Sequence, residues 1–193
     1  MNESKIDFSE VKAFNLDEYY PIKKDNPQSY VKFMDDNLFS HINIKHENVY
    51  IPNGETDSPK AECESYEKEI KASGGIDLQI LGIGENGHIG FNEPDTTLNS
   101  FTHLTKLTEN TIKANSRFFD SYDKVPKNAL TMGIATILKA RKIILLASGT
   151  NKSYAVAELL NGGINTLVPA TLLKVHSDVV FLCDESAYSS VVN

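Results

Sequence analysis

Apolar positions along the chain form two patterns, continuous runs and helical spacings. Continuous runs predict buried strands at residues 77–82, 142–147 and 179–183, and shorter runs predict strands within residues 14–20 and 49–51. Helical spacing and capping residues predict helices at residues 28–40, 58–73, 108–120, 134–140, 151–160 and 169–174. Residues 129–132 are assigned to a turn between two of these helices.

The alternation of strands and helices indicates βαβ units. We therefore predict the α/β class, with a three-layer αβα, Rossmann-like architecture and a mainly parallel sheet. No internal repeat, low-complexity tract or Pro/Gly/Ser-rich linker interrupts the 193 residues. A single domain over residues 1–193 is the resulting expectation.

Composition and charge narrow the classes of function. The formal net charge is −7, which argues against a general nucleic-acid binder because such a protein needs a basic face. The longest apolar runs are too short to cross a bilayer, and the first residues lack the apolar core of a secretion signal. Cys63 and Cys183 lie far apart without metal-like spacing, so free thiols are favoured over a disulfide. A cytoplasmic protein without membrane contact is predicted.

The most informative segment is residues 82–94, which read Gly-Ile-Gly-Glu-Asn-Gly-His-Ile-Gly-Phe-Asn-Glu-Pro directly after a predicted strand. Its glycines allow a sharp turn and a close approach of the backbone to a ligand. His88 can exchange protons near neutral pH, and Glu93 and Asn86 can orient its ring. The alternative is a surface histidine bound to a loop carbonyl. A zinc site is a further alternative, but without a His-Glu-x-x-His pattern or a nearby cysteine we predict no metal.

Other candidates lie elsewhere in the chain. Asp17, at a predicted strand end, is suited to removing a proton next to a carbonyl, although a solvated loop acid is the alternative. Arg117 and Lys152 are candidate cations for an anionic substrate, and Lys152 follows a turn of small residues at a predicted helix start, a natural phosphate seat. The alternative is that both are ordinary solvent-exposed cations without a role in binding. The remaining histidines are expected to be solvated, at loop or helix-end positions: 41, 46, 103 and 176.

Residues 82–94 resemble the signature of glucosamine-6-phosphate deaminases. Further segments with the same resemblance are Phe-Asn-Leu-Asp-Glu-Tyr at 14–19, Asn-Pro-Gln-Ser-Tyr at 26–30, Ala-Asn-Ser-Arg-Phe-Phe at 114–119 and Pro-Lys-Asn-Ala-Leu-Thr-Met-Gly at 126–133. The resemblance extends from about residue 10 to the C-terminus. Related phosphosugar lactonases share the fold but not these residues.

The resemblance implies conversion of glucosamine 6-phosphate and water into fructose 6-phosphate and ammonia, without cofactor or metal. His88 would open the sugar ring, supported by Glu93 and Asn86. Asp17 would move a proton between C2 and C1. Arg117 and Lys152 would hold the phosphate of this small-molecule substrate. The oligomeric state, monomer or homo-oligomer, stays open.

Two departures from the family pattern accompany the resemblance. Position 86 is Asn where one branch of the family has Asp, and an amide can orient His88 but cannot share a proton with it. Residues 1–13 do not match the strand and Gly/Thr-rich phosphate loop with which family members begin, so the domain is expected to be N-terminally incomplete relative to them. A catalytically silent sugar-phosphate-binding or assembly module, and a phosphosugar lactonase, are the alternative functions.

Overall fold

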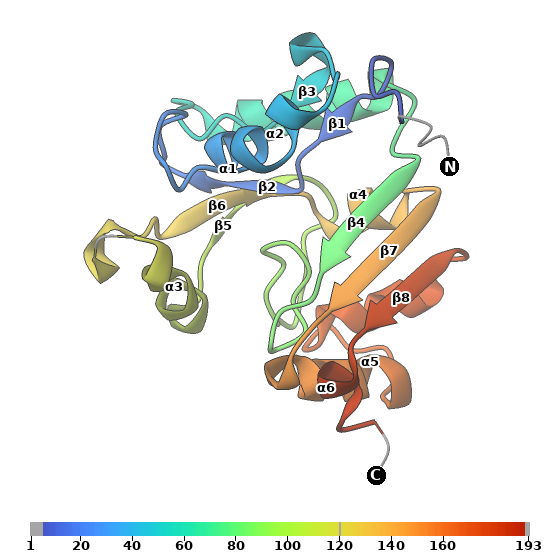
Figure 1. Ribbon diagram of the computed structural model, residues 1–193. Coiled ribbons are helices and arrows are strands. Elements are labelled where there is room, and N and C mark those ends of the chain that lie inside the picture. The colour runs from blue at the N-terminus through green and yellow to red at the C-terminus, as the bar shows by residue number, and fades with distance from the viewer. Residues whose placement is uncertain (1–5, 120, 192–193) are drawn as a thin grey trace.

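The computed structural model describes residues 6–119 and 121–191 (Figure 1). Its larger parallel sheet has the strand order β4-β7-β8, and a second parallel pair joins β1 to β3. The bounds are β1 (Ala13–Phe14), β3 (Val49–Tyr50), β4 (Leu78–Gly82), β7 (Lys142–Ala147) and β8 (Val179–Cys183). The apolar runs at 77–82, 142–147 and 179–183 therefore form the predicted strands.

A three-stranded antiparallel sheet, which the sequence did not predict, has the order β2-β6-β5. Its strands are β2 (Asp17–Tyr20), β5 (His103–Lys106) and β6 (Asn128–Thr131). The assignment of residues 129–132 to a turn is wrong, because 129–131 belong to the central strand β6. The expectation for His103 is also wrong, since it lies half-buried on β5, opposite Thr131. Asp17 begins a strand instead of ending one.

Five of the predicted helices are α-helices with fewer residues than expected, whereas the helix predicted at 169–174 is a 3₁₀ helix over Pro169–Val175. The short α-helix Glu185–Tyr188 was not predicted. The bounds of the α-helices are as follows. They are α1 (Tyr30–Asn37), α2 (Pro59–Ala72), α3 (Glu109–Asn115), α4 (Ile134–Leu138), α5 (Ser153–Asn161) and α6 (Glu185–Tyr188). Short 3₁₀ helices are η1 (Phe39–His41), η2 (His46–Asn48), η3 (Ser116–Phe118), η4 (Tyr122–Lys124), η5 (Thr150–Lys152) and η6 (Pro169–Val175). The predicted helix at 108–120 ends early, where Ser116 Oγ donates to the Lys113 carbonyl and the chain tightens into η3.

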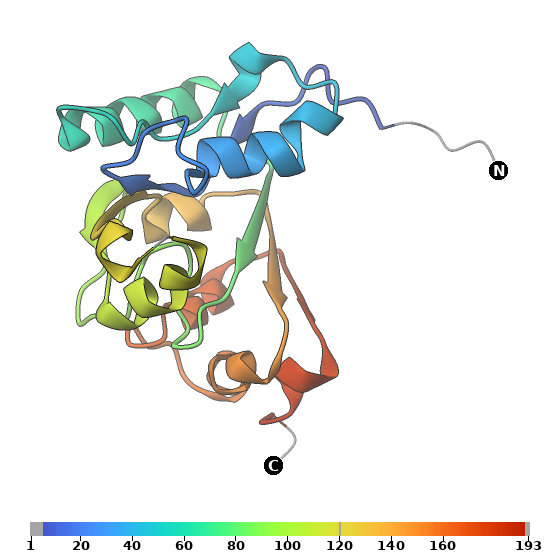
Figure 2. The same cartoon turned by 60° about the vertical axis from the view of Figure 1, so that its left-hand side comes forward.

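The main core lies on one face of the β4-β7-β8 sheet. Leu81, Ile143 and Leu145 point to this face and pack with Ile137 of α4 and Val156 of α5, all essentially excluded from solvent. Burying a side chain of this size contributes about 1.5–3 kcal/mol. Figure 2 shows α4 and α5 together on this side of the sheet. This packing holds fixed the ends of β4 and β7, from which the loops around the main cavity emerge.

The arrangement agrees with the predicted α/β class and a mainly parallel, Rossmann-like organisation, with the antiparallel sheet as an addition. Among the described residues, helices cover one face of the β4-β7-β8 sheet. Cys63 and Cys183 are free thiols, as predicted. Among the described residues, no helix is both long and apolar enough to span a membrane.

Candidate active site

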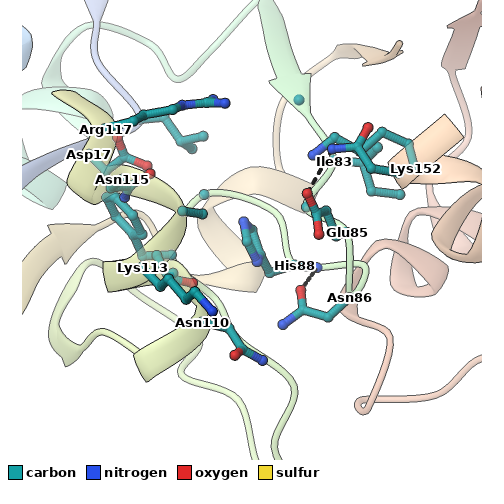
Figure 3. Close-up of a pocket in the computed structure, with 18 of the residues that line it drawn as sticks. Asp17, Ile83, Glu85, Asn86, His88, Asn110, Lys113, Asn115, Arg117 and Lys152 are labelled. Atoms are coloured by element: carbon teal, nitrogen blue, oxygen red, sulfur yellow. Dashed lines mark hydrogen bonds between the residues drawn. The ribbon is translucent and has the colours of Figure 1, made fainter. Parts of the chain in front are cut away.

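A cavity of about 1140 Å³ opens beyond the carboxyl ends of β4 and β7 (Figure 3). Parallel sheets commonly bind ligands at this edge, because loops from neighbouring strands meet there. Asp17 and Arg117 approach from one side, Lys152 from the other, and His88 lies between them. The lining also includes Tyr30, Glu85, Asn86, Asn110, Thr111, Lys113, Asn115, Ser148 and Asn151.

The glycine loop after β4 is shaped around His88. Gly84 N–H donates to the His88 carbonyl at 2.8 Å, and Gly87 N–H donates to the Gly84 carbonyl at 3.0 Å. Gly87 has φ +84°, a left-handed conformation that favours glycine. A Cβ on Gly84 would lie only 2.3 Å from Cε1 of His88. The absence of a side chain at position 84 thus creates the space that the imidazole occupies.

We expect Gly84→Ala to lower catalytic turnover by about 10- to 100-fold, because a displacement of about 1 Å at an acid–base group has this effect. The added methyl would push the His88 ring out of its position while leaving all ionisable groups in place. Steady-state kinetics on the purified variant measures the effect. Gly163→Ala is the matched control, since a Cβ there meets nothing within 4 Å. Equal turnover in both variants would contradict the role given to Gly84.

His88, Asn86 and Glu93 form one interacting unit. Nδ1 of His88 lies 3.4 Å from Oε2 of Glu93, within ion-pair range, although the alignment makes no hydrogen bond. Asn86 Nδ2 donates to the same Oε2 at 2.8 Å, and its Oδ1 accepts from the His88 backbone N–H at 3.2 Å. Asn86 therefore couples the carboxylate to the loop that carries the imidazole.

Glu93 remains an anion across the working pH range. Burial alone would raise its pKa, but the neighbouring His88 imidazole and the hydrogen bonds from Thr111 and Asn86 lower the pKa to about 2. Thr111 Oγ1 donates to Oε1, and Thr108 Oγ1 lies 3.3 Å from the same atom. Thr111 was not among the site residues predicted from the sequence. The helix cap could have indicated this residue, because the N-cap side chain of Thr108 accepts a hydrogen bond from the backbone N–H of Thr111.

Asp17 is a buried carboxyl group with 9% of its surface exposed. Burial, with a second contribution from the charge of Glu18, raises its pKa to about 7. An acid with a pKa near the operating pH can both accept and return a proton, which suits a general acid–base catalyst. The alternative of a solvated loop acid is excluded by this burial.

Glu18 fixes the strand that carries Asp17 to helix α1. Its carboxylate is 1% exposed and accepts the backbone N–H groups of Tyr19 at 2.8 Å, Tyr30 at 2.9 Å and Val31 at 3.1 Å. Two of these donors lie in the first turn of α1, where N–H groups otherwise lack partners. Tyr30 in turn lines the cavity and stacks on Tyr19, with ring centroids 5.4 Å apart.

The two cations predicted from the sequence face the same cavity from different elements. Arg117 lies on η3, where its guanidinium stacks over the Phe118 ring at 4.6 Å. Lys152 ends η5, immediately before α5. Burial lowers the pKa of Lys152, and Arg117 acts in the same direction, while Glu85 opposes the shift. Lys113, a third cation in the lining, was not predicted from the sequence.

All six predicted site residues therefore lie together. Asp17, Asn86, His88, Arg117 and Lys152 line the cavity, and Glu93 stands directly behind the imidazole. Within the described residues, no cluster of three or more His, Cys, Asp or Glu side chains could hold a metal ion. The arrangement offers an imidazole paired with a carboxylate, a second acid with a pKa near neutrality, and cations for an anionic group.

Comparison with known proteins places these residues in a family. Residues 1–182 match the family model described as glucosamine-6-phosphate isomerases/6-phosphogluconolactonase. A glucosamine-6-phosphate deaminase from Halothermothrix orenii is 58% identical over 187 residues, covering 97% of this chain and 78% of that protein. One from Thermoanaerobacter sp. is 56% identical, covering 97% and 74%.

Solved structures agree. A monomeric glucosamine-6-phosphate deaminase of the NagB superfamily overlays with a TM-score of 0.93 at 49% identity, covering 95% of this chain and 76% of that one. A 6-phosphogluconolactonase from Thermotoga maritima, with a TM-score of 0.73 and 23% identity over 94% of this chain and 76% of that one, shares the fold. The chain therefore belongs to the glucosamine-6-phosphate isomerase/6-phosphogluconolactonase family, within its glucosamine-6-phosphate deaminase branch.

Proposed function

We propose that the chain is a glucosamine-6-phosphate deaminase, acting in the cytoplasm on a small phosphosugar and not on nucleic acid. The observation that carries the proposal is the convergence of Asp17 and the His88–Glu93 pair on one cavity that also holds Arg117 and Lys152. The names of the 58% and 49% identical relatives support the choice of substrate. No observation favours lactone hydrolysis over this reaction.

The proposed reaction divides between two proton-transfer groups. His88, held by the Glu93 anion and the Asn86 bridge, takes the proton of the C1 hydroxyl and delivers a proton to the ring oxygen, and the sugar ring opens. Asp17 then takes the proton from C2 while the C2 nitrogen gives up a proton and O1 gains one, which forms an enolamine. Return of the proton from Asp17 to C1 turns the enolamine into a ketose-type imine. Water adds to C2 of the imine, and ammonia leaves. Arg117 and Lys152 hold the phosphate, which keeps C1 and C2 between the two groups.

Ammonia release from glucosamine 6-phosphate tests the proposal. The full chain is expected to release one ammonia for each fructose 6-phosphate formed. Saturable binding of the phosphosugar without ammonia would instead indicate a silent binding module. Hydrolysis of 6-phosphogluconolactone without ammonia release would indicate a lactonase.

The pH dependence follows from Asp17. Because its pKa is raised to about 7, the proton acceptor is lost as the pH falls through that value, and kcat/KM is expected to decline on the acid side of pH 7. Glu18→Gln removes a negative charge that contributes to this shift, so the acid limb should move to lower pH. Glu47→Gln, at an exposed position, is the control. A limb that stays in place in Glu18→Gln would contradict this assignment.

A further inference from the structure

One face of the β4-β7-β8 sheet is apolar and uncovered. The residues that alternate with the core positions are Leu78, Ile80, Ile144, Leu146, Val180 and Leu182, and the strand register places them side by side. Ile80 is 57% exposed and Leu182 52%. In Figures 1 and 2, no described helix or strand lies over this face, whereas α4 and α5 cover the other. We call these six residues the open face.

The composition of the open face is that of a buried surface. Strands of a parallel sheet normally carry helices on both faces and are therefore apolar on both, as β4, β7 and β8 are. Exposed apolar patches of this kind mark interaction sites on soluble proteins. The open face thus has the chemistry of an interface with the apolar side of an amphipathic helix.

The edge of the same sheet is also unpaired. Among the described residues, β4 pairs only with β7, and β1 pairs only with β3. In Figures 1 and 2, β1 lies near the start of β4. A strand between β1 and β4 would join the two parallel sheets.

The relatives contain additional chain of a suitable length. The 187 matched residues make up 78% of the Halothermothrix orenii protein, so roughly 50 of its residues lie outside the match. A strand, a crossover helix and the return to the sheet need about 30 residues. The monomeric glucosamine-6-phosphate deaminase that overlays on this chain with a TM-score of 0.93 likewise has about a quarter of its residues outside the overlay.

We propose that the open face and the free edge of β4 bind a strand–helix segment equivalent to the part of the relatives outside the match. The strand pairs with β4, and an amphipathic helix covers Ile80 and Leu146. The proposal does not depend on the deaminase activity, because its test measures binding alone.

The test uses the full chain and a peptide comprising the residues of the Halothermothrix orenii protein outside the match. Light scattering after gel filtration should show a 1:1 complex, and backbone amides of β4 should gain protection from hydrogen exchange. Ile80→Glu should weaken binding about tenfold or more, since it places a charge in an apolar contact. Ile164→Glu, at another exposed apolar position, should bind as the unmodified chain does.

Several outcomes would overturn the proposal. One is the absence of binding, and another is binding that Ile80→Glu and Leu146→Glu leave unchanged. A third is a dimer of the chain itself that Ile80→Glu dissociates, because the occupant of the open face would then be a second copy. Circular dichroism of each variant separates loss of binding from loss of folding, since substitutions at exposed positions should leave the spectrum intact.

Discussion

His88→Gln is expected to lower kcat for ammonia release by about 10²- to 10⁴-fold, the usual contribution of a positioned acid–base group. Glutamine keeps a polar side chain of similar length but cannot gain or lose a proton near neutral pH. The KM should change much less than kcat, because Arg117 and Lys152 stay in place. A coupled assay for ammonia with purified protein measures both parameters.

His46→Gln is the matched control, since His46 is exposed on η2 and does not line the cavity. It should leave kcat unchanged. Part of the activity of His88→Gln should persist, because amino sugars open slowly without a catalyst and Asp17 can still act on the open form. Full activity in His88→Gln would remove the imidazole from the mechanism.

Asp17→Asn is expected to have the largest effect, a loss of about 10⁴-fold or more, because an amide cannot carry the proton from C2 to C1. Ring opening at His88 should survive, so exchange between the two anomers of bound substrate should continue without ammonia release. Asp57→Asn, an exposed aspartate outside the cavity, is the control. Ammonia release at the normal rate in Asp17→Asn would contradict the proposed proton transfer.

The same substitution should change stability in a pH-dependent way. The folded state raises the pKa of Asp17 from 3.8 to about 7, so the folded protein holds a proton that the unfolded chain releases between these values. Stability should therefore fall as the pH rises through this window. The amide in the Asp17→Asn variant does not titrate, so this pH-dependent loss of stability should be absent. The free energy of unfolding of the variant, relative to that of the unmodified chain, should therefore increase between pH 4 and pH 8, and urea denaturation measures it.

The parallel part of the fold was predictable because its signals are local. Continuous apolar runs mark β4, β7 and β8, and the capping residue Thr108 marks the start of α3. The antiparallel sheet was not predictable in this way. β2, β5 and β6 are four residues each, and the residues of β2 pair with residues of β6 that lie more than one hundred positions away in the sequence. Partners this distant, not local pattern, decide whether such short segments become strands.

The residues of the site also divide into those with a local sequence signal and those whose role depends on distant parts of the chain. His88, Asn86 and Glu93 lie within one loop, so the sequence alone indicated that they act together. The burial of Asp17, and hence its raised pKa, depends on the pairing of β2 with β6. Thr111 and Lys113 were missed because a helix brings them to the cavity without any distinctive residue type. Burial and position in the cavity distinguish these groups from ordinary surface residues, and both depend on residues that are distant in the sequence.

The most direct test of the central claim, that Asp17 and His88 act on one sugar, is a crystal structure with a non-reacting open-chain amino-alditol 6-phosphate. The expected result places the C1–C2 end within about 3 Å of the Asp17 carboxylate, with the hydroxyl end of the chain reaching His88 and the phosphate at Lys152 or Arg117. A ligand bound with its phosphate in this cavity but with C1 and C2 beyond reach of Asp17 would contradict the proposed chemistry.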